Sequence, residues 1–252
     1  MLEQFSRTEL LFGEEAMEKL AASRVAIFGV GGVGGHAVEA LARSGVGTLD
    51  IIDNDTVCMS NINRQLIATM KTLGQYKVDV AKERILDINP DAKVNCYKTF
   101  YMPDTREQFD FSRYDYVVDA IDTVTGKIEL IMQANEAGVP IISSMGAGNK
   151  VNPAMFEVDD IYNTSVCPLA KVMRRELKKR NIKHLKVVYS KENPISPRVA
   201  NTGNNCDNVS EDDSNQTVRK KAIPGSTAFV PSVAGLIIAS EVVKDIIGLK
   251  NL

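Results

Sequence analysis

A run of glycines, Gly29-Val30-Gly31-Gly32-Val33-Gly34, is the segment of this 252-residue chain whose residue types point most clearly to chemistry. It follows a short apolar stretch at 24–28 and leads into a helical pattern that reaches Leu41. A strand, a glycine turn and a helix in this order can bind phosphate, because unshielded backbone amides and the helix N-terminus attract an anion. Gly29, Gly31, Gly32 and Gly34 are therefore predicted to bind nucleotide phosphates. The plainer alternative is that they only permit a tight crossing from strand to helix.

Two acidic residues follow the next predicted strand, which covers residues 49–52. Asp53 comes directly after this strand, about 20 residues beyond the glycine run, where a carboxylate accepts hydrogen bonds from the ribose of a nucleotide. We therefore expect Asp53 to bind ribose, although a carboxylate at a strand end can also be structural. Asp55 is assigned to the same nucleotide site, or it only shapes the loop.

Cationic and amide side chains in the following loops distinguish two classes of nucleotide enzyme. Arg64 lies close to Asn61 and Gln65 in the chain, and Lys77 begins the next helical pattern. The pyrophosphate of NAD is bound mainly by backbone amides, whereas displacement at a phosphate of ATP needs cationic side chains and usually Mg²⁺. Asp122, after a later strand, is a carboxylate suited to that metal. The set favours ATP chemistry over hydride transfer.

The spacing of these motifs resembles the superfamily of ubiquitin-activating-type adenylating enzymes. Within that superfamily, the chain resembles the tRNA threonylcarbamoyladenosine dehydratases. The segments that carry this closer resemblance are Ser144-Met145-Gly146-Ala147-Gly148-Asn149-Lys150, Asp160-Ile161 with Cys167-Pro168-Leu169-Ala170-Lys171-Val172, Val187-Val188-Tyr189-Ser190, and Pro224-Gly225-Ser226-Thr227-Ala228-Phe229-Val230-Pro231. The resemblance covers nearly the whole chain, with a departure in the polar stretch near 204–216.

The resemblance implies an enzyme that uses ATP to cyclise threonylcarbamoyladenosine beside the anticodon of tRNA. In that family the substrate carboxylate attacks the α-phosphate of ATP, and pyrophosphate leaves. A nucleophile of the same modification then closes the ring, and AMP is lost. Ring closure is intramolecular, so no second substrate has to be captured. The sequence accordingly needs no separate catalytic dyad.

The resemblance also implies roles for individual residues. Arg64 and Lys77 match the side chains that contact the triphosphate, and Asp122 matches the position that holds Mg²⁺. Arg7 matches an arginine that reaches the ATP of a neighbouring subunit, which implies a homodimer. Plainer readings stay open: an exposed loop arginine, a lysine that points to solvent, a helix N-cap and a solvated N-terminal arginine, respectively.

A cluster of lysines and arginines at 171–186 is strongly one-sided in charge. Such a run is usually a solvated face, but in a slightly acidic protein a concentrated cationic ridge also suits the phosphate backbone of tRNA. We expect this helix to contact tRNA. Cys167 precedes it, and we interpret its thiol as structural or substrate-lining rather than as a thioester nucleophile, because no basic partner is evident.

Three other functions stay open at this stage. The first is an adenylating activator of the C-terminus of a ubiquitin-like sulfur carrier, disfavoured by the missing Cys-x-x-Cys pairs and by the basic ridge. The second is an NAD-dependent oxidoreductase, and the third is a nucleotide-sensing protein without chemistry. A sulfur-relay partner such as a cysteine desulfurase also stays open.

Alternating strands and helices predict an α/β fold with a doubly wound, mostly parallel sheet and a C-terminal extension. We expect one domain over 1–252, with a nucleotide-binding core at about 20–150 and a substrate-side extension at about 151–252. Polar residues at 199–221 predict a mobile loop. An amphipathic helix is expected over 8–22, where Leu10, Leu11, Met17 and Leu20 are the predicted buried positions.

Bulk composition supports a cytoplasmic protein. The formal net charge of -2 excludes a globally basic nucleic-acid binder, and the first residues show no secretory signal. The longest apolar run, at 228–239, is shorter than the roughly 20 residues that span a bilayer, so we expect no stable membrane association. The four cysteines stand far apart and give no zinc signal, which fits free thiols in a reducing compartment.

Overall fold

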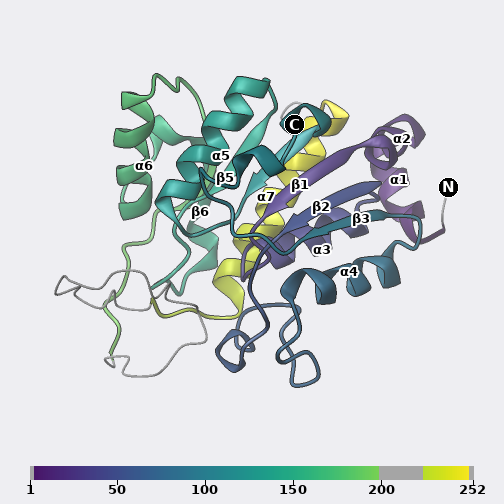
Figure 1. Cartoon of the computed structure of the whole chain (residues 1–252), viewed down its shortest axis with the longest axis horizontal. Coiled ribbons are helices and arrows are strands. Elements are labelled where there is room, and N and C mark those ends of the chain that lie inside the picture. Colours follow the sequence, from purple (N-terminus) through teal and green to yellow (C-terminus); the bar gives the residue numbers. More distant parts are fainter. Residues whose placement is uncertain (1–2, 199–223, 250–252) are drawn as a thin grey trace.

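A computed structural model describes residues 3–198 and 224–249 of the chain. Its centre is a seven-stranded sheet with the order β3-β2-β1-β4-β5-β7-β6, shown in Figure 1. The strands are β1 (Arg24–Phe28), β2 (Thr48–Ile52), β3 (Lys93–Tyr97), β4 (Tyr116–Asp119), β5 (Ile141–Ser144), β6 (Phe156–Asp160) and β7 (Lys186–Ser190).

The helices alternate with these strands along much of the chain. They are α1 (Ser6–Phe12), α2 (Glu14–Ala22), α3 (Gly34–Arg43), α4 (Lys77–Ile88), α5 (Val124–Ala137), α6 (Pro168–Lys179) and α7 (Phe229–Ile247). Short 3₁₀ turns cover Glu3–Phe5, Met59–Asn61, Arg106–Gln108, Phe111–Arg113, Pro153–Met155 and Ile161–Asn163. Among the described residues, no helix is both long and apolar enough to cross a membrane.

All neighbouring strand pairs are parallel except β6 and β7. The predicted doubly wound, mostly parallel sheet is therefore confirmed. Strand β1 pairs with β2 on one side and with β4 on the other, so the chain reverses its direction of winding at β1. In such sheets a crevice opens beyond the carboxyl ends of the strands at the reversal, and ligands bind there. The loops after β1, β2 and β4 meet at this carboxyl edge.

Alternate residues of each strand face opposite layers, as the pleat requires. Val25 and Ile27 of β1 belong to a core that includes buried residues of α3, α4 and α7. Ala26 and Phe28 belong to a second core with α5 and a group of aromatic rings from the segment between β3 and β4. Helix α6 packs over β7 in a third cluster. Burial of both faces explains why the central strands are mostly apolar, with a few buried polar residues such as Asp50 and Asp119.

The C-terminal part of the chain completes the same sheet. Strands β6 and β7 extend it beyond β5, and α7 packs along α3, the helix that follows the glycine run. Figure 1 shows α7 running across the sheet behind β1. The division near residue 150 stays a prediction, and the loop expected at 199–221 lies outside the described residues.

The single helix expected over 8–22 is wrong. Gly13, with a φ of 82°, separates α1 from α2. Met17 and Leu20 of α2 are buried as predicted, whereas Leu10 and Leu11 of α1 are 86% and 81% exposed. The break turns α1 away from the core, because a positive φ cannot continue a right-handed helix. Two leucines are therefore presented at the surface.

Candidate functional site

The glycine run forms a tight turn between β1 and α3. Gly29 has a φ of 92°, and a Cβ there would lie 2.7 Å from the carbonyl oxygen of Ala120. A Cβ on Gly34 would lie 1.7 Å from the Gly29 carbonyl oxygen. A Cβ on Gly31 would meet only Gln65 Nε2, at 3.9 Å. A side chain at Gly29 or Gly34 would clash with a backbone carbonyl, so these two glycines permit the tight turn. Gly31 leaves room for a ligand to approach the amides.

A second loop lies against the glycine turn. A Cβ on Gly32 would be 3.6 Å from Arg64 Cγ and 3.2 Å from Pro231 Cβ at the start of α7. Asn63 Nδ2 donates to the carbonyl of Ser226 at 3.1 Å, which joins the loop to the segment preceding α7. The structure therefore brings together the glycines, Arg64 and Gln65, as the sequence predicted.

The guanidinium of Arg64 is only partly engaged within the chain. Its Nη1 donates to the carbonyl of Ser60 at 2.7 Å and to Asn63 Oδ1 at 3.0 Å. Nε and Nη2 have no hydrogen-bond partner among the described residues. The side chain is half-buried beside the glycine turn rather than extended into bulk water. This leaves two N–H-bearing atoms free for a bidentate anion.

Asn61 and Gln65 are amides buried at the same place, and each has an unsatisfied atom. Asn61 is 1% exposed, and its Oδ1 accepts from the backbone N–H of Cys58 at 3.0 Å. Asn61 Nδ2 and Gln65 Oε1 are buried without a partner. Buried polar atoms in native proteins are nearly always paired, so atoms of this kind call for a ligand or water. One donor and one acceptor are therefore available at the glycine turn.

Asp53 is anchored to both neighbouring loops. Its Oδ2 accepts from the N–H of Val30 at 2.7 Å, and its Oδ1 accepts from the N–H of Asp55 at 2.9 Å. Burial raises the pKa of the Asp53 carboxyl, although nearby Lys77 opposes that shift. Each oxygen retains acceptor capacity, so the side chain can still accept from a ribose hydroxyl.

Lys77 is buried at the first turn of α4, only 4% exposed. Its Nζ lies 2.6 Å from Asp55 Oδ2 and 3.9 Å from Asp53 Oδ1. The reading in which this lysine points to solvent is wrong. A cation at a helix N-terminus is held unfavourably by the helix dipole, and here two carboxylates compensate. Asp55 is thus a partner of Lys77 and does more than shape the loop.

Asp122 lies in the turn between β4 and α5 and is exposed. Its carboxylate has no hydrogen bond or ion pair among the described residues. Thr123, not Asp122, occupies the N-cap position of α5, and the buried Thr123 hydroxyl has no partner. Within residues 3–198 and 224–249, no group of three or more His, Cys, Asp or Glu could hold a metal alone. A single carboxylate fits Mg²⁺ that is bound mainly through phosphates.

Arg7 does not reach the site of its own chain. It is exposed on α1, which lies at the opposite edge of the sheet. Phe5, just before α1, packs against Gly45 in the connection that leads into β2. Gln4 donates to the carbonyl of Ile88, just before β3. These contacts place the N-terminal helix where strands begin.

The basic ridge predicted at 171–186 is helical along α6, but several of its charges are already paired. Glu176 lies 2.9 Å from Lys179 Nζ and 3.0 Å from Arg180 Nη1, which lower the pKa of its carboxyl to about 2. Arg174 donates to Thr164, and Lys186 pairs with Asp245 at 2.7 Å. Lys171, Lys178 and Lys183 are exposed with no acidic partner in the described part of the chain.

Cys167 is buried at the N-cap of α6, next to Gly146. A Cβ on Gly146 would be 3.9 Å from its sulfur. A buried thiol packed against the segment after β5 supports the structural reading, in which it is not presented to a carrier protein.

One buried cation at this edge escaped sequence reasoning. Lys127, on α5, is 1% exposed and lies 3.0 Å from Asp119 at the end of β4. A usable signal was present: Leu130 and Ile131, three and four residues further on, are apolar and buried. A lysine at that spacing faces the core, where it must be paired.

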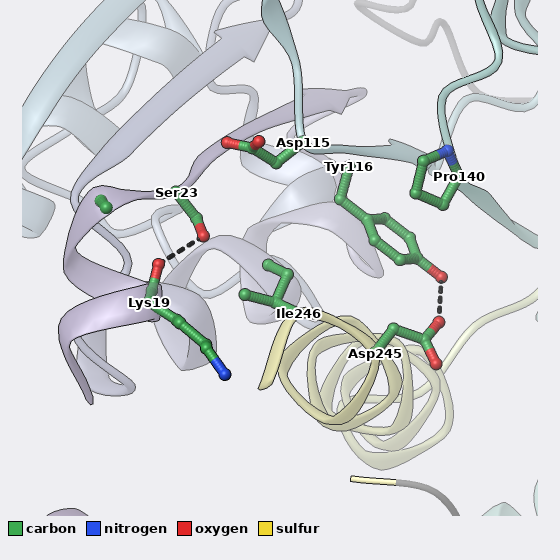
Figure 2. A pocket seen from close by; sticks show the side chains of 8 residues that line it. Lys19, Ser23, Asp115, Tyr116, Pro140, Asp245 and Ile246 are labelled. Atoms are coloured by element: carbon green, nitrogen blue, oxygen red, sulfur yellow. Dashed lines mark hydrogen bonds between the residues drawn. The ribbon is translucent and has the colours of Figure 1, made fainter. Parts of the chain in front are cut away.

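A hollow of about 380 Å³ lies at the other edge of the sheet, where the strands begin, and holds none of the predicted site residues. Figure 2 shows Tyr116 and Asp245 next to each other in its lining, with the Tyr116 hydroxyl donating to Asp245 Oδ2 at 2.6 Å. Ser23 Oγ donates to the carbonyl of Lys19 at 2.6 Å. The polar groups that line this hollow are already paired, so we assign the predicted chemistry to the carboxyl edge of the sheet.

The fold and this edge define a doubly wound α/β protein with a glycine-turn nucleotide site. The chain belongs to the ThiF family, whose model matches residues 5–252. It is 48% identical, over 251 residues, to the tRNA threonylcarbamoyladenosine dehydratase of Bacillus subtilis (strain 168), covering 98% of this chain and 96% of that relative. The resemblance inferred from the sequence is confirmed.

Two crystal structures of the Escherichia coli tRNA N6-threonylcarbamoyladenosine dehydratase extend the comparison. The complex with ATP has a TM-score of 0.84 and 31% identity, and it covers 98% of this chain and 94% of that chain. The complex with AMP has a TM-score of 0.85 with the same identity and coverage. The likeness therefore includes the C-terminal part as well as the glycine turn.

Proposed function

We propose that this protein is an ATP-dependent enzyme that dehydrates threonylcarbamoyladenosine next to the anticodon of tRNA. The observation that carries the proposal is the carboxyl edge, where Arg64, Lys77 and two unsatisfied amides surround an open glycine turn. The similarity to the Bacillus subtilis dehydratase over nearly the whole of both chains supports the substrate. The ATP and AMP complexes of the Escherichia coli dehydratase support the cosubstrate.

The reaction has two steps. An oxygen of the substrate carboxylate bonds to the α-phosphorus of ATP, and the bond from that phosphorus to pyrophosphate breaks. A nucleophile of the same modification then bonds to the activated carbonyl carbon. The carbon–oxygen bond to AMP breaks and the nucleophile gives up its proton, so one carboxylate oxygen leaves with AMP and the modified base is lighter by the elements of one water. Adenylation is needed because a carboxylate is a poor electrophile without such a leaving group.

The chain's residues divide this work by position. The amides near Gly31 and the free N–H groups of Arg64 bind phosphate oxygens and stabilise the charge that develops at the α-phosphorus. Lys77 contributes positive charge for the triphosphate, because its Nζ lies 2.6 Å from Asp55 Oδ2 and 3.9 Å from Asp53 Oδ1, and Asp53 is itself bonded to the glycine turn through Val30. Asp53 orients the ribose. Gln65 and Asn61 pair their buried free atoms with the nucleotide.

Asp122 would hold Mg²⁺ together with the phosphates. Its carboxylate is exposed in the turn after β4 and makes no hydrogen bond or ion pair among the described residues. The carbonyl of Ala120, in the same turn, lies close to Gly29. The metal, when bound, neutralises charge on the triphosphate and orients it. One carboxylate is enough for this, because Mg²⁺ keeps several waters and phosphate ligands.

A homodimer would bring Arg7 to the nucleotide of a neighbouring subunit. Within one chain Arg7 lies at the wrong edge of the sheet, and α1 also presents Leu10 and Leu11 to the surface. Two exposed leucines beside an arginine that has no ion pair within the described ranges suit an interface in which α1 packs on a second copy. In this arrangement Arg7 contributes positive charge in trans.

The unpaired lysines of α6 and the turn after it supply the contact with tRNA. Lys171, Lys178 and Lys183 are exposed and lack an acidic partner among the described residues. They carry a phosphate-binding surface even though Glu176 neutralises part of the ridge. A cytoplasmic location, where tRNA is found, and a core-plus-extension division near residue 150 complete the proposal. A sulfur-relay partner remains an open part of it.

Activation of a sulfur-carrier C-terminus is the second candidate function. One experiment separates the two: purified protein is given ATP and Mg²⁺ with modified tRNA, unmodified tRNA or a carrier protein, and AMP and pyrophosphate are measured. AMP formation that needs threonylcarbamoyladenosine in the tRNA supports the dehydratase. AMP formation that needs the carrier instead promotes the alternative.

A further inference from the structure

A buried ion pair lies beneath the candidate site and has no role in the chemistry proposed above. Lys127 Nζ lies 3.0 Å from Asp119 Oδ1 and donates to the carbonyl of Ser144 at 2.8 Å. Asp119 Oδ2 accepts from the hydroxyl of Ser143 at 2.5 Å. Lys127, Asp119 and Ser143 are all buried. The network therefore joins three elements, namely α5 and the ends of β4 and β5.

The same network reaches the turn that carries Asp122. Asp119 Oδ1 also accepts from the backbone N–H of Ile121 at 3.4 Å, within the β4–α5 turn. Ala120, in that turn, presents its carbonyl to Gly29, whose Cβ would lie 2.7 Å away. The hydrogen bonds and ion pair of Asp119 therefore fix the position of the Ala120 carbonyl beside the glycine turn. They also fix the start of the segment that ends in Asp122.

On the other side, Lys127 holds the beginning of the segment after β5. Its bond to the Ser144 carbonyl lies where the strand ends and residues 145–150 begin. That segment is tied to the chain before α7, since Asn149 N–H donates to the Gly225 carbonyl at 2.8 Å and Asn149 Oδ1 accepts from Gly225 N–H at 2.7 Å. One lysine thus contacts the nucleotide-side turn through Asp119 and, directly, the segment that leads into the substrate-side extension.

We infer that Lys127 is a positioning residue that couples the turn at 119–122 to the segment at 144–149, so that nucleotide binding orders the substrate side. The inference rests on the proposed function, because it assigns the acid to be adenylated to the 144–149 side. The chain already pays the desolvation cost of two buried charges, which apolar residues of the same volume would avoid. Such a cost is retained where the charges fix a geometry that apolar packing would not.

A matched ion pair away from the carboxyl edge provides the control. Arg24 and Asp50 form a bidentate pair, with Nε–Oδ1 and Nη2–Oδ2 distances of 3.1 and 2.7 Å. They join β1 to β2, and Asp50 is fully buried. The test compares two double variants. One combines Lys127→Met with Asp119→Asn, and the other combines Arg24→Met with Asp50→Asn. Each removes both charges, so neither leaves a lone buried ion.

Backbone amide exchange reads the coupling without substrate. In the Lys127/Asp119 double variant we expect exchange at Ile121 and across 145–149 to rise at least tenfold. In the wild type and in the Arg24/Asp50 variant, ATP slows exchange across 145–149, and in the Lys127/Asp119 variant it does not. Unchanged exchange in a folded Lys127/Asp119 variant, or the same loss in the control, would overturn the inference.

Kinetics supply the second readout. With modified tRNA, we expect kcat for AMP formation to fall at least tenfold in the Lys127/Asp119 variant while KM for ATP changes less than threefold. Wild-type rates in that variant would contradict the role. If the Lys127/Asp119 variant does not fold, Ser143→Ala removes one hydrogen bond to Asp119 instead. In that variant we expect amide exchange across 145–149 to rise at least threefold and kcat to fall at least threefold. No change in either quantity also overturns the inference. A wild-type protein that forms no AMP defeats the proposed function, yet the exchange experiment still decides the coupling.

Discussion

The two edges of the sheet differ in how far their buried polar groups find hydrogen-bond partners within the chain. Away from the carboxyl edge, Asp50 at the middle of β2 accepts from Arg24 at the start of β1, from Asn95 Nδ2 at 2.6 Å and from the Tyr97 hydroxyl at 3.2 Å. Tyr116 donates to Asp245, which also pairs with Lys186, beside the hollow in Figure 2. These groups satisfy one another within the chain.

At the carboxyl edge, polar groups are buried without partners. Asn61 Nδ2, Gln65 Oε1 and the Thr123 hydroxyl are unsatisfied, and Arg64 has free N–H groups. Each unsatisfied buried group costs about 1–3 kcal/mol. Lys127, Asp119 and Lys77 are paired at this edge, so the atoms left without partners are the ones available to a ligand. The polar groups that line the hollow at the first edge are paired within the chain, so they offer little to a ligand.

The largest loss of activity is expected on removal of the phosphate-binding cations at the carboxyl edge. We expect Arg64→Ala and Lys77→Ala each to lower kcat/KM for AMP formation by two or more orders of magnitude, about 3 kcal/mol of lost charge stabilisation. The measurement is AMP release with modified tRNA. Lys19→Ala, which removes a cation from the opposite edge, is the control and should keep the wild-type rate per folded molecule. Near-normal turnover in both carboxyl-edge variants would contradict the assigned roles.

Disruption of the pairing around Asp50, away from the carboxyl edge, should affect stability and leave the chemistry intact. Asp50→Ala leaves Arg24, Asn95 and Tyr97 without their shared acceptor, and we expect a loss of roughly 3 kcal/mol in the free energy of unfolding. Chemical denaturation measures the loss, and active-site titration corrects turnover for the folded fraction. If corrected turnover fell as far as in Arg64→Ala, the division between the edges would be wrong.

Asp122→Asn sharpens the comparison within the carboxyl edge. Loss of the exposed Asp122 carboxylate should raise the Mg²⁺ concentration for half-maximal AMP formation about tenfold, since Mg²⁺ prefers anionic oxygen ligands. ATP binding without metal, measured by calorimetry, should change little. Asp115→Asn, at the opposite edge, is the matched control. A wild-type metal requirement in Asp122→Asn would remove the metal role.

The raised pKa of Asp53 predicts a pH effect on ATP binding. Only the ionised carboxylate accepts from both ribose and backbone, and burial makes it protonate at a higher pH than an ordinary carboxyl of pKa about 3.9. ATP affinity should therefore decline on acidification, several-fold, before exposed carboxyls titrate. Binding titrations across pH test this, and Asp53→Asn should be weaker throughout and lack the decline. A decline that persists unchanged in that variant would assign it to another group.

The smallest effect is expected at the basic helix. Glu176→Gln releases Lys179 and Arg180, so tRNA should bind a few-fold more tightly, and the dependence of the affinity on salt should steepen by up to about one unit of log–log slope. Filter binding at several salt concentrations measures both. Because the pKa of Glu176 is about 2, its charge is constant at neutral pH. Weaker binding, or an unchanged slope, would separate α6 from tRNA.

Much of the fold follows from local patterns. The helical pattern that begins at Lys77 is α4, Lys77–Ile88, and the strand predicted over 49–52 is β2, Thr48–Ile52. The helical pattern after the glycine run is α3, Gly34–Arg43. These elements are encoded by residues close together in the chain, which is why sequence alone finds them.

Contacts between distant residues could not be read in this way. Leu10 and Leu11 have helical apolar spacing, but whether a helix is covered depends on the rest of the fold and on Gly13. Lys127 meets Asp119 and Ser144 only after β4 and β5 pair. The partial neutralisation of the basic ridge by Glu176 also needs side-chain geometry. Pairing of charges, unlike their presence, is a property of the folded chain.

The central claim is that the unpaired groups at the carboxyl edge hold ATP so that a carboxylate attacks its innermost phosphorus. Modified tRNA labelled with a heavy oxygen isotope in the threonyl carboxylate tests this directly, with mass spectrometry of the released nucleotide. The account predicts that each AMP carries one labelled oxygen and that the tRNA base becomes lighter by one water. Label that appears in inorganic phosphate, or AMP that carries oxygen only from the solvent, would contradict it.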